Sequence, residues 1–186
     1  MNTALAGGRS SDRPPAAAGH DTAAFRDAMS ELAAGVALVT CRVDGRPWGT
    51  TVTAFESVTV EPPTVLVALG SDTRAAAAIA ERGCFGINVL AANQVVLAHL
   101  ASRAGAPKYL EQFTTPGSTG SAAPAIEGAL AQLECVLFDA VDVAGKTVFF
   151  ALVLTARASG AGSPLLYHRR GYRTLRPDQG DRHVLR

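Results

Sequence analysis

Runs of strand-forming residues that follow one another without an intervening helix limit most strongly what this chain can fold into. Residues 36–43, 49–55 and 64–69 are rich in Val, Thr and Phe, and only the turn-forming segments 44–47 and 61–63 separate them. A doubly wound parallel sheet needs a helix between successive strands, because parallel neighbours require a long crossover connection. The sequence therefore predicts a mainly β, antiparallel fold.

The remaining predicted elements agree with that fold. Helices are expected from Thr22, over 74–81 and over 93–102, each with an N-cap signal or an apolar repeat. The other expected strands are 85–90, 130–143, 147–158 and 165–168. We expect a small antiparallel β-barrel with a few peripheral helices, interrupted by a long, polar, functional or mobile loop at 103–124.

A length of 186 residues suits one domain. Residues 1–21 are rich in Gly, Ser, Pro and Ala without periodicity, so they are expected to form a disordered tail. The domain is expected over 22–176, followed by a charged C-terminal tail at 177–186.

Charge and cysteine usage indicate a cytoplasmic protein. A net charge of +1 gives no electrostatic reason to expect nucleic acid or a membrane surface as a partner. Cys41, Cys84 and Cys135 lie in apolar stretches without a Cys-x-x-Cys motif, so they are interpreted as buried thiols in a reducing compartment. The first residues lack the order of a signal peptide, and no apolar run approaches the ~20 residues of a membrane span.

A threonine-rich strand is the first candidate for chemistry. Thr51, Thr53, Phe55 and Ser57 are predicted to share one strand face. Hydroxyl groups beside an aromatic ring suit a flat ligand with a polar edge. An ordinary Thr-rich strand remains the alternative, because Thr is a good β-former.

Three further segments could bind a ligand. Residues 71–74 (Ser-Asp-Thr-Arg) stand at a predicted helix start, where an anion is favoured, although a simple Thr73 N-cap explains them equally. Asn88 is a polar residue in an apolar strand and needs a partner, either a ligand or a structural hydrogen bond. Lys108 and Tyr109 lie in the long loop, where a lysine is usually solvated.

His168 is the histidine selected as a candidate contact for an anionic or redox ligand, with a surface histidine as the alternative. His99 is interpreted as a helix-surface residue. No Ser/His/Asp order, metal-ligand spacing, G-x-G-x-x-G or P-loop motif occurs, so hydrolase, metalloenzyme, Rossmann dehydrogenase and P-loop ATPase functions have little support.

Taken in order, these segments resemble the flavin reductase-like family of short-chain NAD(P)H:flavin oxidoreductases. The resemblance covers residues 25 to about 175. Its motifs are Phe25-Arg26-Asp27-Ala28-Met29, the run 34–40, Gly49-x-Thr51-x-Thr53-x-Phe55-x-Ser57-Val58, Pro62-Pro63, Asn88-Val89-Leu90, Lys108-Tyr109, Gly128-Ala129-Leu130, Leu133-Glu134-Cys135 and Pro164-Leu165-Leu166-Tyr167-His168.

The resemblance implies a homodimeric split β-barrel that binds FAD or FMN near the dimer interface. It implies that NADH or NADPH is the electron donor and that reduced flavin diffuses to a separate monooxygenase. The implied flavin-binding residues are Thr51, Val52, Thr53, Ala54, Ser57, Ser71, Thr73, Arg74, Asn88, Val89, Lys108 and Tyr109. His168 is implied as the catalytic residue at the nicotinamide, accompanied by Lys146 and Tyr172.

The chain departs from the family's pattern near the nicotinamide. Residues 144–146 read Ala-Gly-Lys where many members have Gly-Asp-His, which leaves open whether Lys146 replaces that contact. This departure favours an alternative function, a non-catalytic flavin carrier or sensor on the same barrel, whereas His168 favours the enzyme. An oxidase of the pyridoxamine phosphate type fits the architecture but not the order of motifs.

Overall fold

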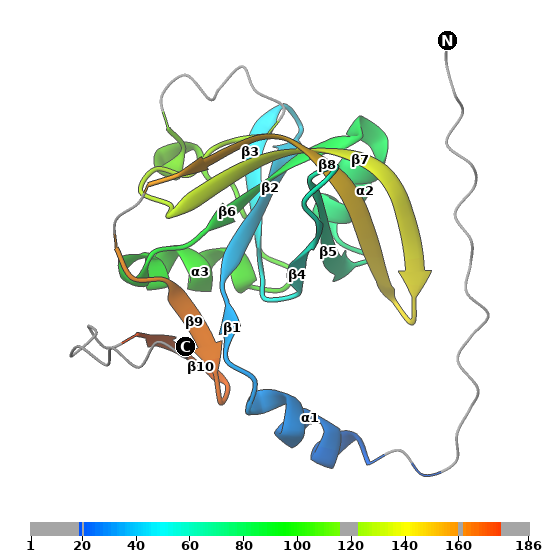
Figure 1. The fold of residues 1–186 in the computed structure, drawn as a ribbon, viewed down its shortest axis with the longest axis vertical. Helices are drawn as coiled ribbons and strands as arrows, with labels where there is room; N and C mark the ends of the chain where they lie inside the picture. The colour runs from blue at the N-terminus through cyan, green and yellow to red at the C-terminus, as the bar shows by residue number, and fades with distance from the viewer. Residues whose placement is uncertain (1–18, 20, 116–122, 160–161, 176–186) are drawn as a thin grey trace.

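The fold consists of ten strands, three α-helices and two short 3-10 helices in the residues described by a computed structural model, which are 19, 21–115, 123–159 and 162–175 (Figure 1). In chain order they are α1 (Thr22–Ser30), β1 (Ala34–Gly35), β2 (Ala37–Val43), β3 (Arg46–Val52), β4 (Phe55–Thr59), β5 (Thr64–Gly70), α2 (Arg74–Arg82), β6 (Cys84–Val89), η1 (Ala92–Gln94), α3 (Val95–Ser102), η2 (Glu111–Phe113), β7 (Ala131–Val143), β8 (Lys146–Ala158), β9 (Leu165–His168) and β10 (Gly171–Thr174). The predicted mainly β fold with a few helices is confirmed. Most of the two expected tails lies outside the described residues.

Every strand pairing is antiparallel, as predicted from the missing crossover helices. One sheet has seven strands in the order β3-β2-β6-β7-β8-β5-β4, and a smaller sheet has the order β1-β9-β10. The larger sheet is open in the described part of the chain, with β3 and β4 as its edges. The sheet nevertheless curls, as shown by Val52 from β3 and Val67 from β5, which belong to the same buried core.

Three hairpins have two-residue turns in which both residues have a positive φ. This is the geometry of a type I′ turn, whose twist matches that of the flanking strands. Asp44-Gly45 (φ 52° and 74°) joins β2 to β3, and Ala144-Gly145 (φ 48° and 81°) joins β7 to β8. The β9–β10 turn is unusual, since it places two arginines, Arg169 and Arg170, at φ 48° and 58°.

The core is divided by the sheet into two clusters. Val39 of β2 packs with α2, whereas its neighbour Leu38 packs with α3. Because successive side chains of a strand point to opposite faces, α2 and α3 cover opposite sides of β2. Cys41 and Cys135 are buried as predicted, and burial raises the pKa of each thiol to about 12, while Cys84 is partly exposed.

Helix α1 is attached mainly through charge. None of its residues is buried. Arg169 donates to Glu31 directly after the helix at 2.8 Å, and Arg170 forms an ion pair with Asp27 within it. The Arg169 backbone N–H also donates to Ser30 O at 2.8 Å. The strained β9–β10 turn, formed by Arg169 and Arg170, therefore holds α1 against the smaller sheet.

The structure corrects the predicted strand 49–55. The chain leaves β3 after Val52 and begins β4 at Phe55, so the threonine row is broken. Thr51 donates its hydroxyl to Ala98 O of α3 at 2.8 Å, whereas Phe55 packs on the core cluster of α2. Thr51 and Phe55 therefore do not share a face. The short strands β1 and β10 were also not predicted, because they are too short for a periodic pattern to appear.

Candidate functional site

The outer edge of β3 is one of the two open edges of the seven-stranded sheet. On its inner side, β3 pairs with β2 over its whole length. On its outer side, Gly49 N–H donates to Lys108 O at 3.1 Å, and Pro47 O accepts from Leu110 N–H at 3.0 Å. Because backbone groups alternate in direction along a strand, the N–H and C=O of Thr51 point to the same outer side, beyond the end of this pairing.

Two adjoining hollows follow this edge, and we call them together the β3 groove. They share Ser102 of α3. The first, the tyrosine end, has a volume of about 590 Å³. It is lined by Thr51, Val52, Thr53, Val95, His99, Ser102, Tyr167, Arg170, Gly171 and Tyr172.

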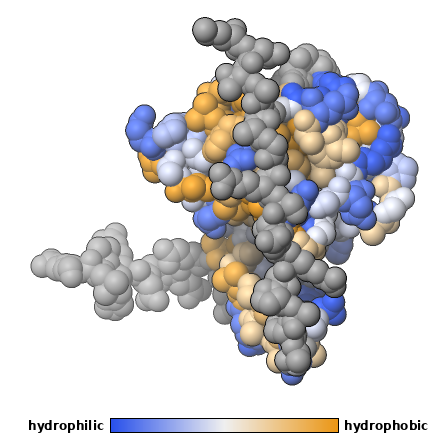
Figure 2. Space-filling view, turned by 90° about the vertical axis from the view of Figure 1, so that its right-hand side faces the viewer, coloured by the Kyte–Doolittle hydropathy of each residue, from blue (hydrophilic) through white to orange (hydrophobic). Residues whose placement is uncertain are grey.

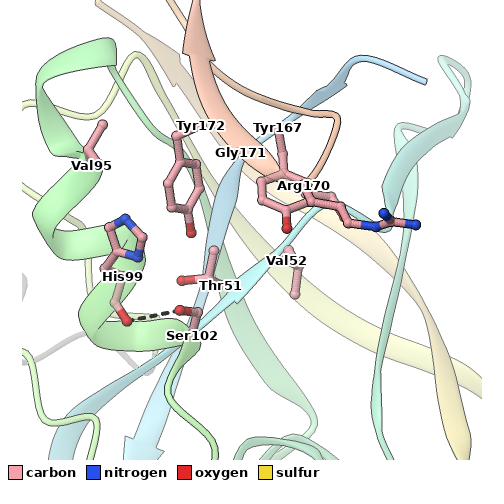
Figure 3. Close-up of a pocket in the computed structure, with 10 residues that line it drawn as sticks. Thr51, Val52, Val95, His99, Ser102, Tyr167, Arg170, Gly171 and Tyr172 are labelled. Atoms are coloured by element: carbon pink, nitrogen blue, oxygen red, sulfur yellow. Dashed lines mark hydrogen bonds between the residues drawn. The ribbon is translucent and has the colours of Figure 1, made fainter. Parts of the chain in front are cut away.

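The tyrosine end is a slot between a strand and a row of rings. Tyr172 packs edge-on against His99 at a centroid distance of 4.7 Å and against Tyr167 at 5.5 Å. Figure 3 shows both tyrosine rings pointing toward Thr51 and Val52 of β3. Burial raises the pKa of Tyr172, and a hydrogen bond with Ser102 opposes part of that rise. A flat ring system fits such a slot, with its polar edge against the Thr51 backbone.

The lysine end of the groove, with a volume of about 500 Å³, lies on the other side of Ser102. Trp48 and Thr50 of β3, residues 72–74 at the start of α2, and the loop 104–108 line it. The Thr73 hydroxyl caps α2 by accepting from Ala76 N–H at 3.2 Å, and it donates to Gly70 O at 2.8 Å. The α2 terminus therefore faces this hollow with its positive dipole end.

Lys108 gives the lysine end its preference for an anion. Burial lowers the pKa of its ammonium group below the usual range. The ion pairs recorded between described residues involve Arg46, Arg74, Arg169 and Arg170, and none of them involves Lys108. A partly buried cation without a carboxylate partner favours a bound anion, because the anion offsets its desolvation.

Fold and site together define a mainly β protein with a two-part groove along a strand edge, lined by aromatic rings at one end and by Lys108 at the other. The comparisons agree with this class. Residues 29–176 match the flavin reductase like domain, and the chain belongs to the flavin reductase-like family. Membership in this family confirms the resemblance found in the sequence.

The similar proteins support that assignment. The chain is 37% identical to the reductase component of a 4-nitrophenol 4-monooxygenase/4-nitrocatechol 2-monooxygenase from Rhodococcus opacus, over 80% of this chain and 78% of that protein. It is 39% identical to an FMN reductase (NADH), RutF 2, from Methylorubrum extorquens, over 83% of this chain and 91% of that protein. The solved structure of an NADH:FAD oxidoreductase from Streptomyces globisporus, in complex with NAD and FAD fragments, is 28% identical in sequence. It covers 86% of this chain and 96% of its own, with a TM-score of 0.78.

The groove brings together about half of the residues selected from the sequence. The selected residues that line it are Thr51, Val52, Thr53, Thr73, Arg74, Lys108 and Tyr172. Ala54 lines a neighbouring hollow beside α1. Tyr109 stands behind the groove wall, edge-on to Trp48 at 5.1 Å. Ser57 in β4, Ser71 before α2 and Val89 in β6 do not line the groove.

The three residues selected for nicotinamide do not meet within this chain. Tyr172 lines the slot, but His168 follows Tyr167 on β9 and its side chain points to the other strand face. Lys146 opens β8 opposite Gly70, next to Gly145, whose carbonyl accepts from Ser71 N–H at 3.1 Å. A nicotinamide role for His168 and Lys146 stays a prediction.

The sequence reasoning missed several residues that the groove uses. His99 was interpreted as a surface residue, and although it is exposed, it lines the slot beside Tyr172. Trp48, Ser102 and Tyr167 carried no motif of their own. Only the spacing of His99 and Ser102, three residues apart and hence on one helix face, could have indicated that they act together.

Asn88 takes part in a buried hydrogen-bond network. Its side-chain N–H group donates to Thr40 Oγ1 at 3.0 Å, and its oxygen accepts from Ile126 N–H at 2.9 Å. Thr40 in turn donates to Pro124 O at 2.7 Å. With 1% of its surface exposed, Asn88 ties strands β2 and β6 to the segment 123–126. The structural interpretation therefore accounts for Asn88, and a contact with flavin stays a prediction.

We expect Asn88→Ala to lower the free energy of unfolding by about 2–4 kcal/mol, because the Ile126 N–H and the Thr40 hydroxyl lose a buried partner. Denaturant unfolding measures this loss. Asn93→Ala, at an exposed position of η1, serves as the control and should change stability by less than about 0.5 kcal/mol. An Asn88→Ala protein of full stability that binds flavin poorly would instead assign Asn88 to the ligand.

Proposed function

We propose that the protein is an NAD(P)H:flavin oxidoreductase that reduces FAD or FMN and supplies the reduced flavin to a separate monooxygenase. The single observation that carries this proposal is the β3 groove, with a flat slot at one end and, at the other, a lysine that has no ion pair with any described residue. The printed functions of the relatives agree, since they name an FMN reductase (NADH) and the reductase component of a monooxygenase.

At the tyrosine end, the protein holds the flavin and nicotinamide rings parallel to each other. The Thr51 backbone would hold the polar edge of the flavin ring, and Tyr172 and Tyr167, which line the same slot, would limit its tilt. When bound, flavin supplies the redox chemistry by accepting a hydride at ring N5 from nicotinamide C4. The protein contributes alignment of the rings and exclusion of water, so no acid–base pair is required.

At the lysine end, the chain holds the phosphate of the flavin. The Lys108 ammonium group and the N-terminal amides of α2 face the same hollow. Charge-assisted hydrogen bonds from these groups fix the tail, and the ring is thereby placed at the far end of the groove.

We also propose that the protein is a cytoplasmic homodimer with a split β-barrel in each subunit. The curl of the larger sheet supports the barrel, and residues 22–176 form the domain between tails 1–21 and 177–186. Among the described residues, no helix is long and apolar enough to cross a bilayer. Exposed apolar side chains on three elements support a dimer, and Figure 2 shows orange surface on one face. They are Phe25 and Met29 on α1, Phe138 on β7 and Leu154 on β8, all 49–65% exposed.

We expect the purified protein with free flavin to oxidise NADH or NADPH faster than flavin alone does. The loss of nicotinamide absorbance measures this rate. Both nicotinamides are tested against FAD, FMN and riboflavin, with heat-denatured protein as the control. If no combination is accelerated while flavin still binds, the carrier or sensor function stands in place of the reductase.

We expect the affinity for FMN to fall as the pH rises through the lowered pKa of Lys108. The phosphate binds the charged ammonium group and raises its pKa, so binding takes up a proton and weakens in alkali. Lys108→Ala should weaken FMN binding about ten- to hundredfold near neutral pH. Lys108→Arg, which stays charged, should flatten the pH dependence. Riboflavin lacks phosphate, so an equal pH effect on riboflavin would contradict this role of Lys108. Flavin fluorescence titrations measure all of these affinities.

We expect light scattering to give twice the chain mass of 19.2 kDa. Phe138→Asp should shift the protein toward the monomer, because a buried unpaired charge opposes the interface. Val96→Asp is the matched control, since Val96 is 76% exposed and lies on α3, which carries none of these four side chains. A monomer at every concentration would contradict the dimer.

A further inference from the structure

The cations at or next to the lysine end differ in whether they are already neutralised. Arg74 donates from Nη2 to Asp44 Oδ2 at 2.6 Å. Arg46 donates from Nε to Glu111 Oε1 at 2.5 Å. Lys108 has no ion pair in the described part of the chain. Arg74 therefore lines the hollow, but a carboxylate of this chain already occupies its guanidinium group.

Asp44 is held at this position by two neighbours. Besides Arg74, the Tyr109 hydroxyl donates to the same carboxylate oxygen at 3.3 Å. The hydrogen bond from Arg74 lowers the pKa of the Asp44 carboxyl group, so it stays ionised at neutral pH. A permanently charged carboxylate thus stands where a ligand phosphate would approach Arg74.

The turn itself does not require this charge. Asp44 is the first residue of a two-residue type I′ turn, with φ 52°, and Gly45 is the second. Asn-Gly serves this turn as well as Asp-Gly, because Asn also tolerates a positive φ. The conformation of the turn therefore explains Asp or Asn at position 44, whereas only the contacts with Arg74 and Tyr109 make use of a carboxylate.

Arg74 would remain at the groove wall without Asp44. Its guanidinium carbon lies 5.3 Å from the ring centroid of Trp48, which also lines the lysine end. A cation over an indole face is held there by the ring quadrupole. Both partners of the ion pair are more than half exposed, so a ligand phosphate can exchange with the carboxylate.

We propose that Asp44 is a specificity-determining residue that competes with the ligand phosphate for Arg74 and so weakens the binding of phosphate-ended flavins. The inference rests on the proposed function, since it takes the lysine end as the site of the flavin phosphate. Lys108 attracts the ligand phosphate, and Asp44 limits its affinity by occupying Arg74. The consequence is faster release of FMN or FAD from the groove, because affinity changes within one site appear mainly in the dissociation rate.

The test compares Asp44→Asn with the unchanged protein by fluorescence titration of FMN and of riboflavin. The FMN affinity should rise about two- to fivefold, the range of an exposed ion pair, and riboflavin affinity should stay the same. The double variant Asp44→Asn/Arg74→Ala should lose the gain. Stopped-flow dilution should show slower FMN release from Asp44→Asn by a similar factor.

The matched control is Asp72→Asn, which removes a charge from the same hollow at a residue outside the recorded ion pairs of the described chain. A gain from Asp72→Asn should survive Arg74→Ala, because it does not act through Arg74. If the Asp44→Asn gain also survives Arg74→Ala, or if Asp44→Asn weakens FMN binding, the proposal is wrong.

A second comparison applies even if Asp44→Asn is unstable. Because Arg74 is already paired, Arg74→Ala alone should reduce FMN affinity much less than Lys108→Ala does. Equal losses would overturn the competition. Failure of the unchanged protein to bind any flavin would overturn the proposed function as well, whereas a working reductase with an inert Asp44→Asn variant would overturn only this inference.

Discussion

The outer edge of β3 is the constraint on which the whole groove depends. A strand edge must have its backbone groups paired, solvated or bound to a ligand, since unpaired groups cannot be buried without a large penalty. Here the segment carrying Lys108 pairs with the first half of the edge and stops at Gly49. The same pairing that ends at Gly49 fixes Lys108 at one end of the groove, and at the other end it does not reach the outer backbone groups of Thr51 in the described part of the chain.

The cations around this edge differ in whether a carboxylate neutralises them. Arg46 and Arg74 are paired with carboxylates, whereas the partly buried Lys108 forms no ion pair in the described part of the chain. The arginine pairs contribute little energy of their own, because exposed ion pairs are worth at most about 1 kcal/mol. Their effect is on selectivity, since of the two described cations that line the lysine end, Arg74 is neutralised and Lys108 is not. Such an arrangement agrees with the proposed loose binding of a flavin phosphate at the lysine end, which suits a protein whose product must leave for another enzyme.

The sequence could predict the fold class and most elements because both depend on local patterns. The order of strands without crossover helices indicated antiparallel pairing, and Asp44-Gly45 indicated its hairpin. The break between β3 and β4 was missed, since Thr53 and Ala54 carry no turn signal. In the site, the strand pattern selected Thr51 and Thr53, the helix-start signal selected residues 71–74, and the family resemblance added Val52 and the flavin role. His99 and Trp48 were missed because their proximity arises only from packing. The sequence left Asn88 open between a structural hydrogen bond and a ligand contact, because periodicity does not reveal which hydrogen-bond partner a buried amide finds.

The two walls of the tyrosine slot belong to different sheets. Thr51 stands in the seven-stranded sheet and Tyr172 in the three-stranded one, and the sheets are joined near Val36, whose N–H donates to Leu165 O at 3.0 Å and whose C=O accepts from Leu90 N–H at 2.9 Å. No ladder of backbone hydrogen bonds among the described strands spans the slot itself. The spacing of the two walls is therefore determined by side-chain packing between the sheets, including Tyr172 against His99 of α3 and the buried Leu165. Two stacked aromatic rings need about 3.5–4 Å more than one, so these packing contacts decide how many rings the slot accepts.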